Sequence, residues 1–233
     1  MTPLHRRGVT LIEILVVVAL VGLLSGALVL GQGALGRARL KSSTAMVAGA
    51  IRAAYNHASA TSRPTRLVFD FDQRSVALEQ SEQRMLLRQG ERTGGAAATT
   101  EAERNAVEAA EEILQGPREA RPEFRSVAAE GFTAEEGGSS KTLASGIRFR
   151  QVEVAHEDEP VRSERVYLYF WPGGQTERAA IQIQRGEAEA PAESEVLTVL
   201  VAPLTGKVQV LGGPADMPRP RTEAEESERE EGL

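Results

Sequence analysis

The sequence contains no cysteine among its 233 residues, and only 4% of its residues are aromatic. The absence of cysteine excludes disulfide bonds, thiolate metal ligands and cysteine nucleophiles. Three histidines, His5, His57 and His156, are too far apart in sequence to form a metal-binding motif. The sequence also has neither a G-x-S-x-G nucleophile motif nor a P-loop. We therefore expect a non-enzymatic protein with no cofactor and no metal ion.

Charge is almost absent from the amino-terminal part. From Val9 to Gly36 the only charged side chain is Glu13, although the whole chain has a formal net charge of −6. The segment from Glu223 to Glu231 contains six glutamates and one arginine, so the acidity is concentrated at the other end. A net negative charge argues against nucleic acid as the main partner.

The apolar stretch within residues 9–36 is longer than the roughly 20 residues that cross a bilayer as a helix. His5, Arg6 and Arg7 precede it, and the positive-inside bias then places the amino terminus in the cytoplasm. Residues 9–36 are therefore predicted to form a single transmembrane helix, with the rest of the chain on the other side of the membrane.

Glu13 is the unusual residue of this stretch. A carboxylate inside a bilayer costs about 2.5–3.5 kcal/mol on translocon scales, so its presence indicates a function. A secretory signal peptide cut near small residues such as Ala34 is one interpretation, and an uncleaved anchor is another. Neither interpretation explains the acid.

The residues Arg7-Gly8-Val9-Thr10-Leu11-Ile12-Glu13 resemble the class III signal of type IV pilins and type II secretion pseudopilins. This resemblance implies that a prepilin peptidase removes the leader 1–8 by cutting between Gly8 and Val9, and then methylates the new amino terminus. It also implies that Glu13 docks subunits during filament assembly. Family members more often carry phenylalanine or methionine where this chain has Val9.

The implied docking is physically reasonable. A free α-amine has a pKa of roughly 7.7–8 and a glutamate one of about 4.3, so both groups are charged at neutral pH. Pairing the amine of Val9 in one subunit with Glu13 of its neighbour would neutralise two costly charges inside the membrane. Gly22 and Gly26 form a small-xxx-small pair that could let such helices pack closely.

Beyond the apolar stretch, residues 37–63 predict an amphipathic continuation of the same helix, ending at Arg63-Pro64. Residues 64–213 predict a β-rich head. The strand signals include the alternating segment from Leu67 to Asp72 and the apolar segment from Val196 to Ala202, and a bulge is expected near Arg150-Gln151. We predict an α+β fold in which a long amino-terminal helix packs on a small antiparallel β-sheet head, as in type IV pilins.

Three segments of the head are similar to the general secretion pathway protein H family of minor pseudopilins. They are Arg63-Pro-Thr-Arg-Leu-Val-Phe-Asp70, Phe170-Trp-Pro-Gly-Gly174 and Ala202-Pro-Leu-Thr-Gly-Lys-Val208. Residues 79–142 depart from the family and predict a mobile insertion, with one short helix that starts at a capping box from Thr100 to Glu103. Residues 214–233 predict a disordered acidic tail.

The resemblance implies a minor pseudopilin that helps to initiate or cap a periplasmic filament for protein export across the outer membrane. Its partners would be other major and minor pseudopilins, the prepilin peptidase and the bacterial inner membrane, with a cytoplasmic amino terminus and a periplasmic head. A minor pilin of a type IV pilus or DNA-uptake system is the nearest alternative. A secreted ligand-binding β domain with an ordinary signal peptide is a second.

Overall fold

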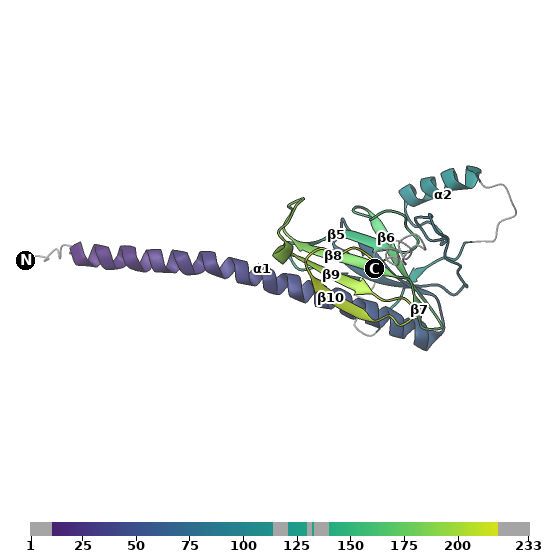
Figure 1. Cartoon of the computed structure of the whole chain (residues 1–233), viewed down its shortest axis with the longest axis horizontal. Helices are drawn as coiled ribbons and strands as arrows, with labels where there is room; N and C mark the ends of the chain where they lie inside the picture. Colours follow the sequence, from purple (N-terminus) through teal and green to yellow (C-terminus); the bar gives the residue numbers. More distant parts are fainter. Residues whose placement is uncertain (1–10, 114–120, 130–131, 133–139, 219–233) are drawn as a thin grey trace, which may run out of the picture.

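The computed structural model describes residues 11–113, 121–129, 132 and 140–218, without the side chains of residues 24–33 and 110–113. Its main feature is α1 (Leu11–Thr61), whose 51 residues extend roughly 77 Å at about 1.5 Å per residue. The first part of α1 projects away from the head, and the second part lies within it (Figure 1). The helix ends where Ser62 adopts a positive φ, two residues before Pro64.

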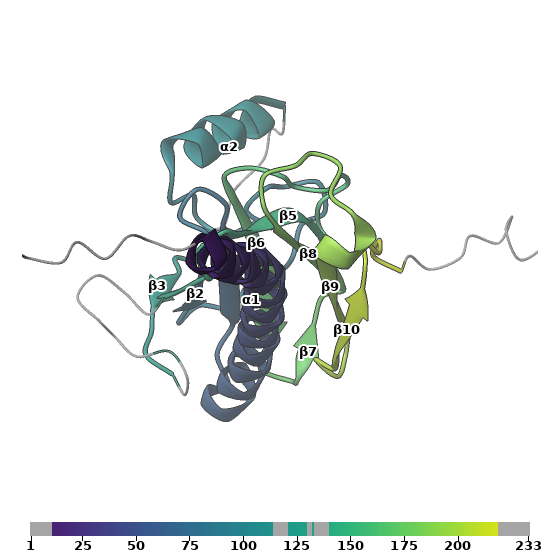
Figure 2. The same cartoon turned by 90° about the vertical axis from the view of Figure 1, so that its left-hand side faces the viewer.

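The described strands of the head form two antiparallel sheets rather than the one small sheet expected from the sequence. The first sheet has the order β3-β2-β1-β6-β7, with β4 also paired to β2, and the second has the order β10-β9-β8-β5. Figure 2 looks along the stem and shows β2 and β3 on one side of α1, with β9 and β10 on the other. The bounds are β1 (Thr65–Asp70), β2 (Ser75–Gln80), β3 (Arg125–Ser126), β4 (Ser140–Thr142), β5 (Ile147–Val154), β6 (Arg165–Trp171), β7 (Gln175–Thr176), β8 (Ala179–Arg185), β9 (Val196–Val201) and β10 (Val208–Gly212), with a 3₁₀ turn at Glu193–Glu195.

The main core lies between α1 and the inner faces of both sheets. Val47, Ile51 and Ala54 of α1 are fully buried there against apolar residues of both sheets. The rings of Phe69 on β1 and Phe149 on β5 meet edge to face, with centroids 5.7 Å apart, so the two sheets share this core. The amphipathic stripe predicted for residues 37–63 is thus the surface on which the head folds.

The outer face of the first sheet is also covered. Residues of the predicted insertion, namely Met85, Ala96 and Phe124, are buried against Val68, Tyr167 and Tyr169 of the sheet. Every residue of β1 is therefore buried, including those expected on a solvent-facing side. Part of the insertion is therefore packed against the head. The alternation of apolar and polar residues in β1 predicted only one buried face and did not indicate this packing.

Several local predictions are confirmed. The alternating segment from Leu67 to Asp72 forms most of β1, and the register of β5 against β8 shifts between Phe149 and Gln151, where a bulge was predicted. Helix α2 (Glu101–Ile113) starts at the predicted capping box: the backbone N–H of Glu103 donates to Thr100 Oγ1, and the N–H of Thr100 donates to a Glu103 carboxylate oxygen, both at 3.2 Å. The α+β class is confirmed by this helix-and-sheet architecture.

Candidate assembly site on the stem helix

Glu13 lies in the first turn of α1 as described, and its side chain is exposed. The predicted processing residues Gly8 and Val9 lie outside the described residues. Their roles and the docking role of Glu13 therefore stay predictions.

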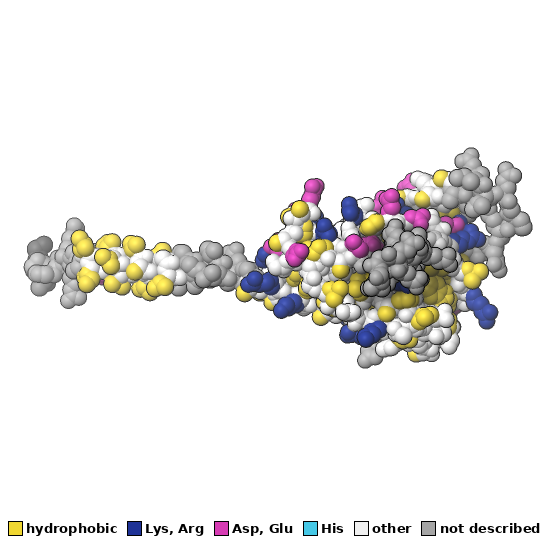
Figure 3. Space-filling view, in the orientation of Figure 1, with side chains coloured by type: hydrophobic (Ala, Val, Ile, Leu, Met, Phe, Trp, Pro, Cys, Tyr) yellow, Lys and Arg dark blue, Asp and Glu magenta, His cyan; other side chains and the backbone are white. Residues whose placement is uncertain are grey.

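The surroundings of Glu13 are apolar and exposed. Leu11, Ile12 and Leu15 are 82%, 70% and 62% exposed, and the exposed apolar side chains continue to Leu23. Figure 3 shows hydrophobic side chains over the end of the stem farthest from the head. A helix that is apolar all round is normally buried in a protein core or a membrane, so this surface is built to be covered.

No helix among the described residues meets the combined length and hydropathy of a membrane span. Within the predicted span, residues 9 and 10 lie outside the described residues, and for residues 24–33, which include Gly26, only the backbone is described. A Cβ added at Gly22 would meet nothing within 4 Å. The surface at Gly22 is thus open to an approaching helix.

The stem is fixed to the head by close contacts along its second half. Tyr55 of α1 packs between two glycine turns, those of Gly174 and Gly206, which both have positive φ values. A Cβ at Gly206 would lie 2.3 Å from Tyr55 Cδ2, so glycine is required there. These two turns belong to two of the segments that suggested the family resemblance, and both hold the helix.

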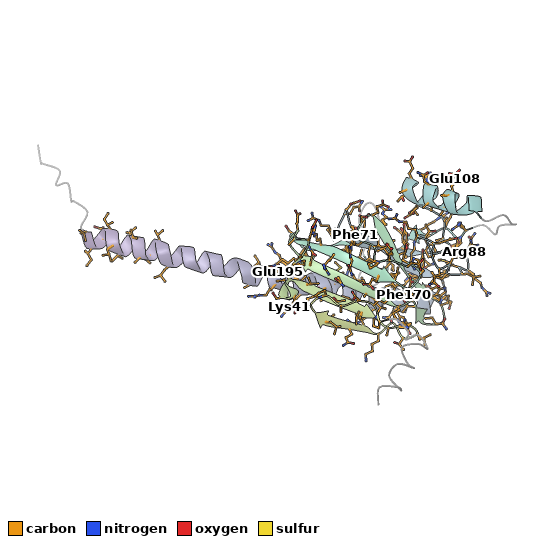
Figure 4. The ribbon with its side chains drawn as sticks, turned by 45° about the horizontal axis from the view of Figure 1, so that its top comes forward. Lys41, Phe71, Arg88, Glu108, Phe170 and Glu195 are labelled. Atoms are coloured by element: carbon orange, nitrogen blue, oxygen red, sulfur yellow. The ribbon has the colours of Figure 1, made fainter. Side chains whose placement is uncertain are left out.

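The entrance of α1 into the head carries several charges. Arg37, Arg39 and Lys41 are exposed on the helix, and Arg185 of β8 forms an ion pair with Glu195 nearby. Figure 4 shows Lys41 and Glu195 at this end of the head. Arg185 lies close enough to Gly36 that a Cβ there would be 2.7 Å from its Cδ.

A second cluster of functional-looking groups lies on the outer face of the first sheet, and sequence analysis missed it. Arg66 is fully buried, with Nε 2.8 Å from a Glu79 carboxylate oxygen and its guanidinium carbon 4.0 Å from the centroid of the Tyr167 ring. Tyr167 also donates a hydrogen bond to Glu103 of α2. Burial raises the pKa of the Tyr167 and Tyr169 phenols, so both stay neutral. The cluster is closed and internally paired, which indicates a structural role.

Another pair, His156 and Glu177, is buried beside Tyr169, with His156 Nδ1 2.7 Å from a Glu177 carboxylate oxygen. The other oxygen of Glu177 accepts the backbone N–H of Tyr169 at 2.9 Å. Asp70 of β1 is buried and accepts hydrogen bonds from Arg165 and from the backbone N–H of Gln73. Among the described residues, no three His, Asp or Glu side chains are placed to hold a metal ion.

Comparison with known proteins locates a prokaryotic N-terminal methylation motif at residues 4–29. This match confirms the predicted amino-terminal methylation signal. No curated protein matches the chain. Two solved structures of the minor pseudopilin EpsH from the type 2 secretion system of Vibrio cholerae are similar. One is 13% identical with a TM-score of 0.39, covering 75% of this chain and 97% of that one. The other is 12% identical with a TM-score of 0.40, covering 77% and 98%.

Proposed function

We propose that this type IV pilin-like chain is a minor pseudopilin of a type II secretion system. In this role it is a structural subunit that helps to initiate or cap a periplasmic filament for protein export across the outer membrane. The observation that carries the proposal is a lone acid, Glu13, on a projecting helix whose other exposed side chains from Leu11 to Leu23 are apolar, within a methylation motif.

The subunit would work through two successive environments of its stem. Before assembly, the apolar part of α1 lies in the inner membrane, with the leader 1–8 in the cytoplasm and the head in the periplasm. After the prepilin peptidase cuts between Gly8 and Val9, the new amine of one subunit pairs with Glu13 of a neighbour. This pairing offsets two charges that are costly in an apolar environment and fixes the axial register of the helices.

Assignment to secretion rather than to a pilus is supported by the resemblance of the head segments to the general secretion pathway protein H family. Two of these segments, at Gly174 and Gly206, form the turns that hold Tyr55. Deleting the gene and following both an exported enzyme and surface pili separates the two assignments. Loss of export with intact pili supports the proposal, and the reverse result identifies a minor pilin.

The docking role is tested by Glu13→Gln, which keeps the size of the side chain and removes its charge. We expect normal membrane insertion and cleavage, but about tenfold less subunit crosslinked into filaments, which corresponds to about 1.4 kcal/mol. Glu101→Gln is the matched control, because Glu101 is an exposed glutamate in the first turn of α2. Equal incorporation of both variants would refute the docking role.

Mass spectrometry of the mature chain tests processing independently. A methylated amino terminus at Val9 is the expected result. A mature protein that starts near Ala34 would instead identify an ordinary secreted domain and overturn the proposed function.

A further inference from the structure

Two arginines of β5, Arg148 and Arg150, and a third in the segment beside it, Arg162, have no acidic partners among the described residues. Arg148 donates to the backbone carbonyl of Glu187 at 2.8 Å, Arg150 donates to the side-chain oxygen of Gln182, and Arg162 donates to Gln151 Oε1 at 3.2 and 3.3 Å. Within the described part of the chain, none of these guanidinium groups has a carboxylate oxygen within 4.0 Å. All of the acceptors are neutral, so three positive charges remain uncompensated.

These arginines line one open groove, which we call the arginine groove, and it is formed by Arg148, Arg150, Gln151, Arg162 and Gln184 with the loop 187–189. Glu187 and Glu189 also line the groove. A carboxylate oxygen of Glu187 lies 3.9 Å from a guanidinium nitrogen of Arg74, and the backbone carbonyl of Glu187 accepts the hydrogen bond from Arg148. Three arginines and two glutamates thus line the groove, and one of these glutamates pairs with Arg74 outside the lining, so the balance of charge is positive.

The carboxy-terminal segment crosses the second sheet. Thr198 on β9 donates to the carbonyl of Gly213 at 2.7 Å, and Gln182 on β8 donates to the carbonyl of Ala215 at 3.0 Å. The backbone N–H of Met217 then donates to a carboxylate oxygen of Glu153 on β5 at 3.0 Å. Three successive bonds thus bring the chain across β9 and β8 to β5, the strand that carries Arg148 and Arg150.

The end of this crossing is connected to the groove through side chains. Glu153 accepts both the Met217 N–H and, at 3.1 Å, the side-chain amide of Gln151. The other end of that amide group, Gln151 Oε1, accepts both bonds from Arg162. A continuous hydrogen-bonded path therefore leads from Met217 to Arg162.

We propose that the acidic segment 223–231 of the same chain docks in the arginine groove. Its first glutamate comes six residues after Met217, which gives a reach of about 20 Å at roughly 3.3–3.6 Å per residue. Neighbouring strands are only about 4.8 Å apart, so this reach covers the groove. The six glutamates of the segment match the uncompensated guanidinium groups in sign.

Because the acidic segment is joined to the head through the short connection after Met217, weak ion pairs are sufficient to keep it in the groove. Individual exposed ion pairs contribute about 0.2–1 kcal/mol, but a short flexible connection gives an effective concentration in the millimolar range. The docked segment would shield the groove at low salt. At about 1 M salt the Debye length falls to about 3 Å, and the segment would be released.

The absence of cysteine allows a direct test in the full chain, purified in detergent micelles. Spin labels on Ala224→Cys in the tail and Ser163→Cys beside Arg162 report their separation by pulsed electron resonance. We expect one narrow, short distance at low salt and a broad distribution at about 1 M salt. Replacing the six glutamates of 223–231 with glutamine should give the broad distribution at every salt concentration, without altering any residue of the folded head.

The head side of the contact is tested by Arg150→Gln with Arg162→Gln, and Arg52→Gln on an exposed position of α1 is the control. We expect only the double variant to broaden the distance. A broad distribution at low salt that neither variant changes would overturn the proposal. The proposal would also be overturned if the short distance appeared only in a mixture of chains labelled at position 224 and chains labelled at position 163. That result would place the acidic segment on another molecule.

Discussion

The two halves of α1 differ in what covers them. In the second half, Val47, Ile51 and Ala54 are fully buried against the head, whereas in the first half Leu11, Ile12 and Ile14 are at least 56% exposed. Both halves are rich in apolar residues, but only the second has them as a stripe matched to polar positions. One helix thus combines a segment that completes a domain core with a segment that is left for another partner.

This difference implies that substitutions in the two halves separate stability from assembly. A change in the second half should be seen in the unfolding of the isolated subunit. A change in the first half should be seen only when a membrane or another subunit covers the stem.

The largest effect is expected for Ile51→Ala. Removing a fully buried isoleucine leaves a cavity between α1 and both sheets and should lower the free energy of unfolding by about 2–5 kcal/mol. Ile14→Ala is the matched change in the first half, where the side chain is 56% exposed, and should stay within about 0.5 kcal/mol. Denaturant unfolding of both variants in the same detergent measures this. Equal losses would show that the halves are not distinct.

A smaller loss is expected for Gly206→Ala, which tests how the second half is held. The new Cβ would lie 2.3 Å from Tyr55 Cδ2 at a φ of +60°. We expect a loss of about 2–4 kcal/mol from overpacking and backbone strain together. Gly186→Ala separates the two causes, because Gly186 has a φ of +78° but nothing within 4 Å of its Cβ position. Only the Gly206 variant should show coupling with Tyr55→Ala in a double-mutant cycle.

The smallest effect is expected away from α1, for Glu103→Gln of α2, whose carboxylate accepts a hydrogen bond from Tyr167 of the first sheet. Burial alone would raise the pKa of Glu103, but hydrogen bonds from Tyr167, Thr99 and Thr100 outweigh it and lower the pKa. The folded state therefore binds this proton less readily than the unfolded state. Glu103 therefore contributes its full stabilisation at pH values above the ordinary glutamate pKa of about 4.3. This stabilisation is lost as the pH falls through the lowered pKa of Glu103 in the folded state.

At neutral pH, Glu103→Gln should cost about 1–2 kcal/mol, because a charged acceptor of several hydrogen bonds is lost. Below about pH 5 the variant should lose stability less steeply than the original chain. Glu101→Gln, at an exposed position two residues earlier, should follow the original pH dependence. Identical acid unfolding curves for all three proteins would contradict the assigned role of Glu103.

The sequence was most informative where one local pattern determines one structure. The capping box at Thr100, the bulge after Phe149 and the end of α1 before Pro64 each depend on neighbouring residues and could be predicted. The burial of Arg66 could not, because it depends on Phe124 from a distant segment, whose ring centroid lies 4.5 Å from the Arg66 guanidinium carbon. In the candidate site, Glu13 could be singled out because it is the sole charge in its stretch.

The position of β1 in its sheet has a mechanical consequence. The chain leaves α1 and enters the head directly through β1, which pairs with β2 through six residue pairs and with β6 through six more. A pull on the stem, as would occur when a subunit is drawn out of a lipid layer, therefore reaches the head through an interior strand held on both sides. The load is shared across two ladders of hydrogen bonds, and the head cannot be unzipped from a free edge at the point where it is attached.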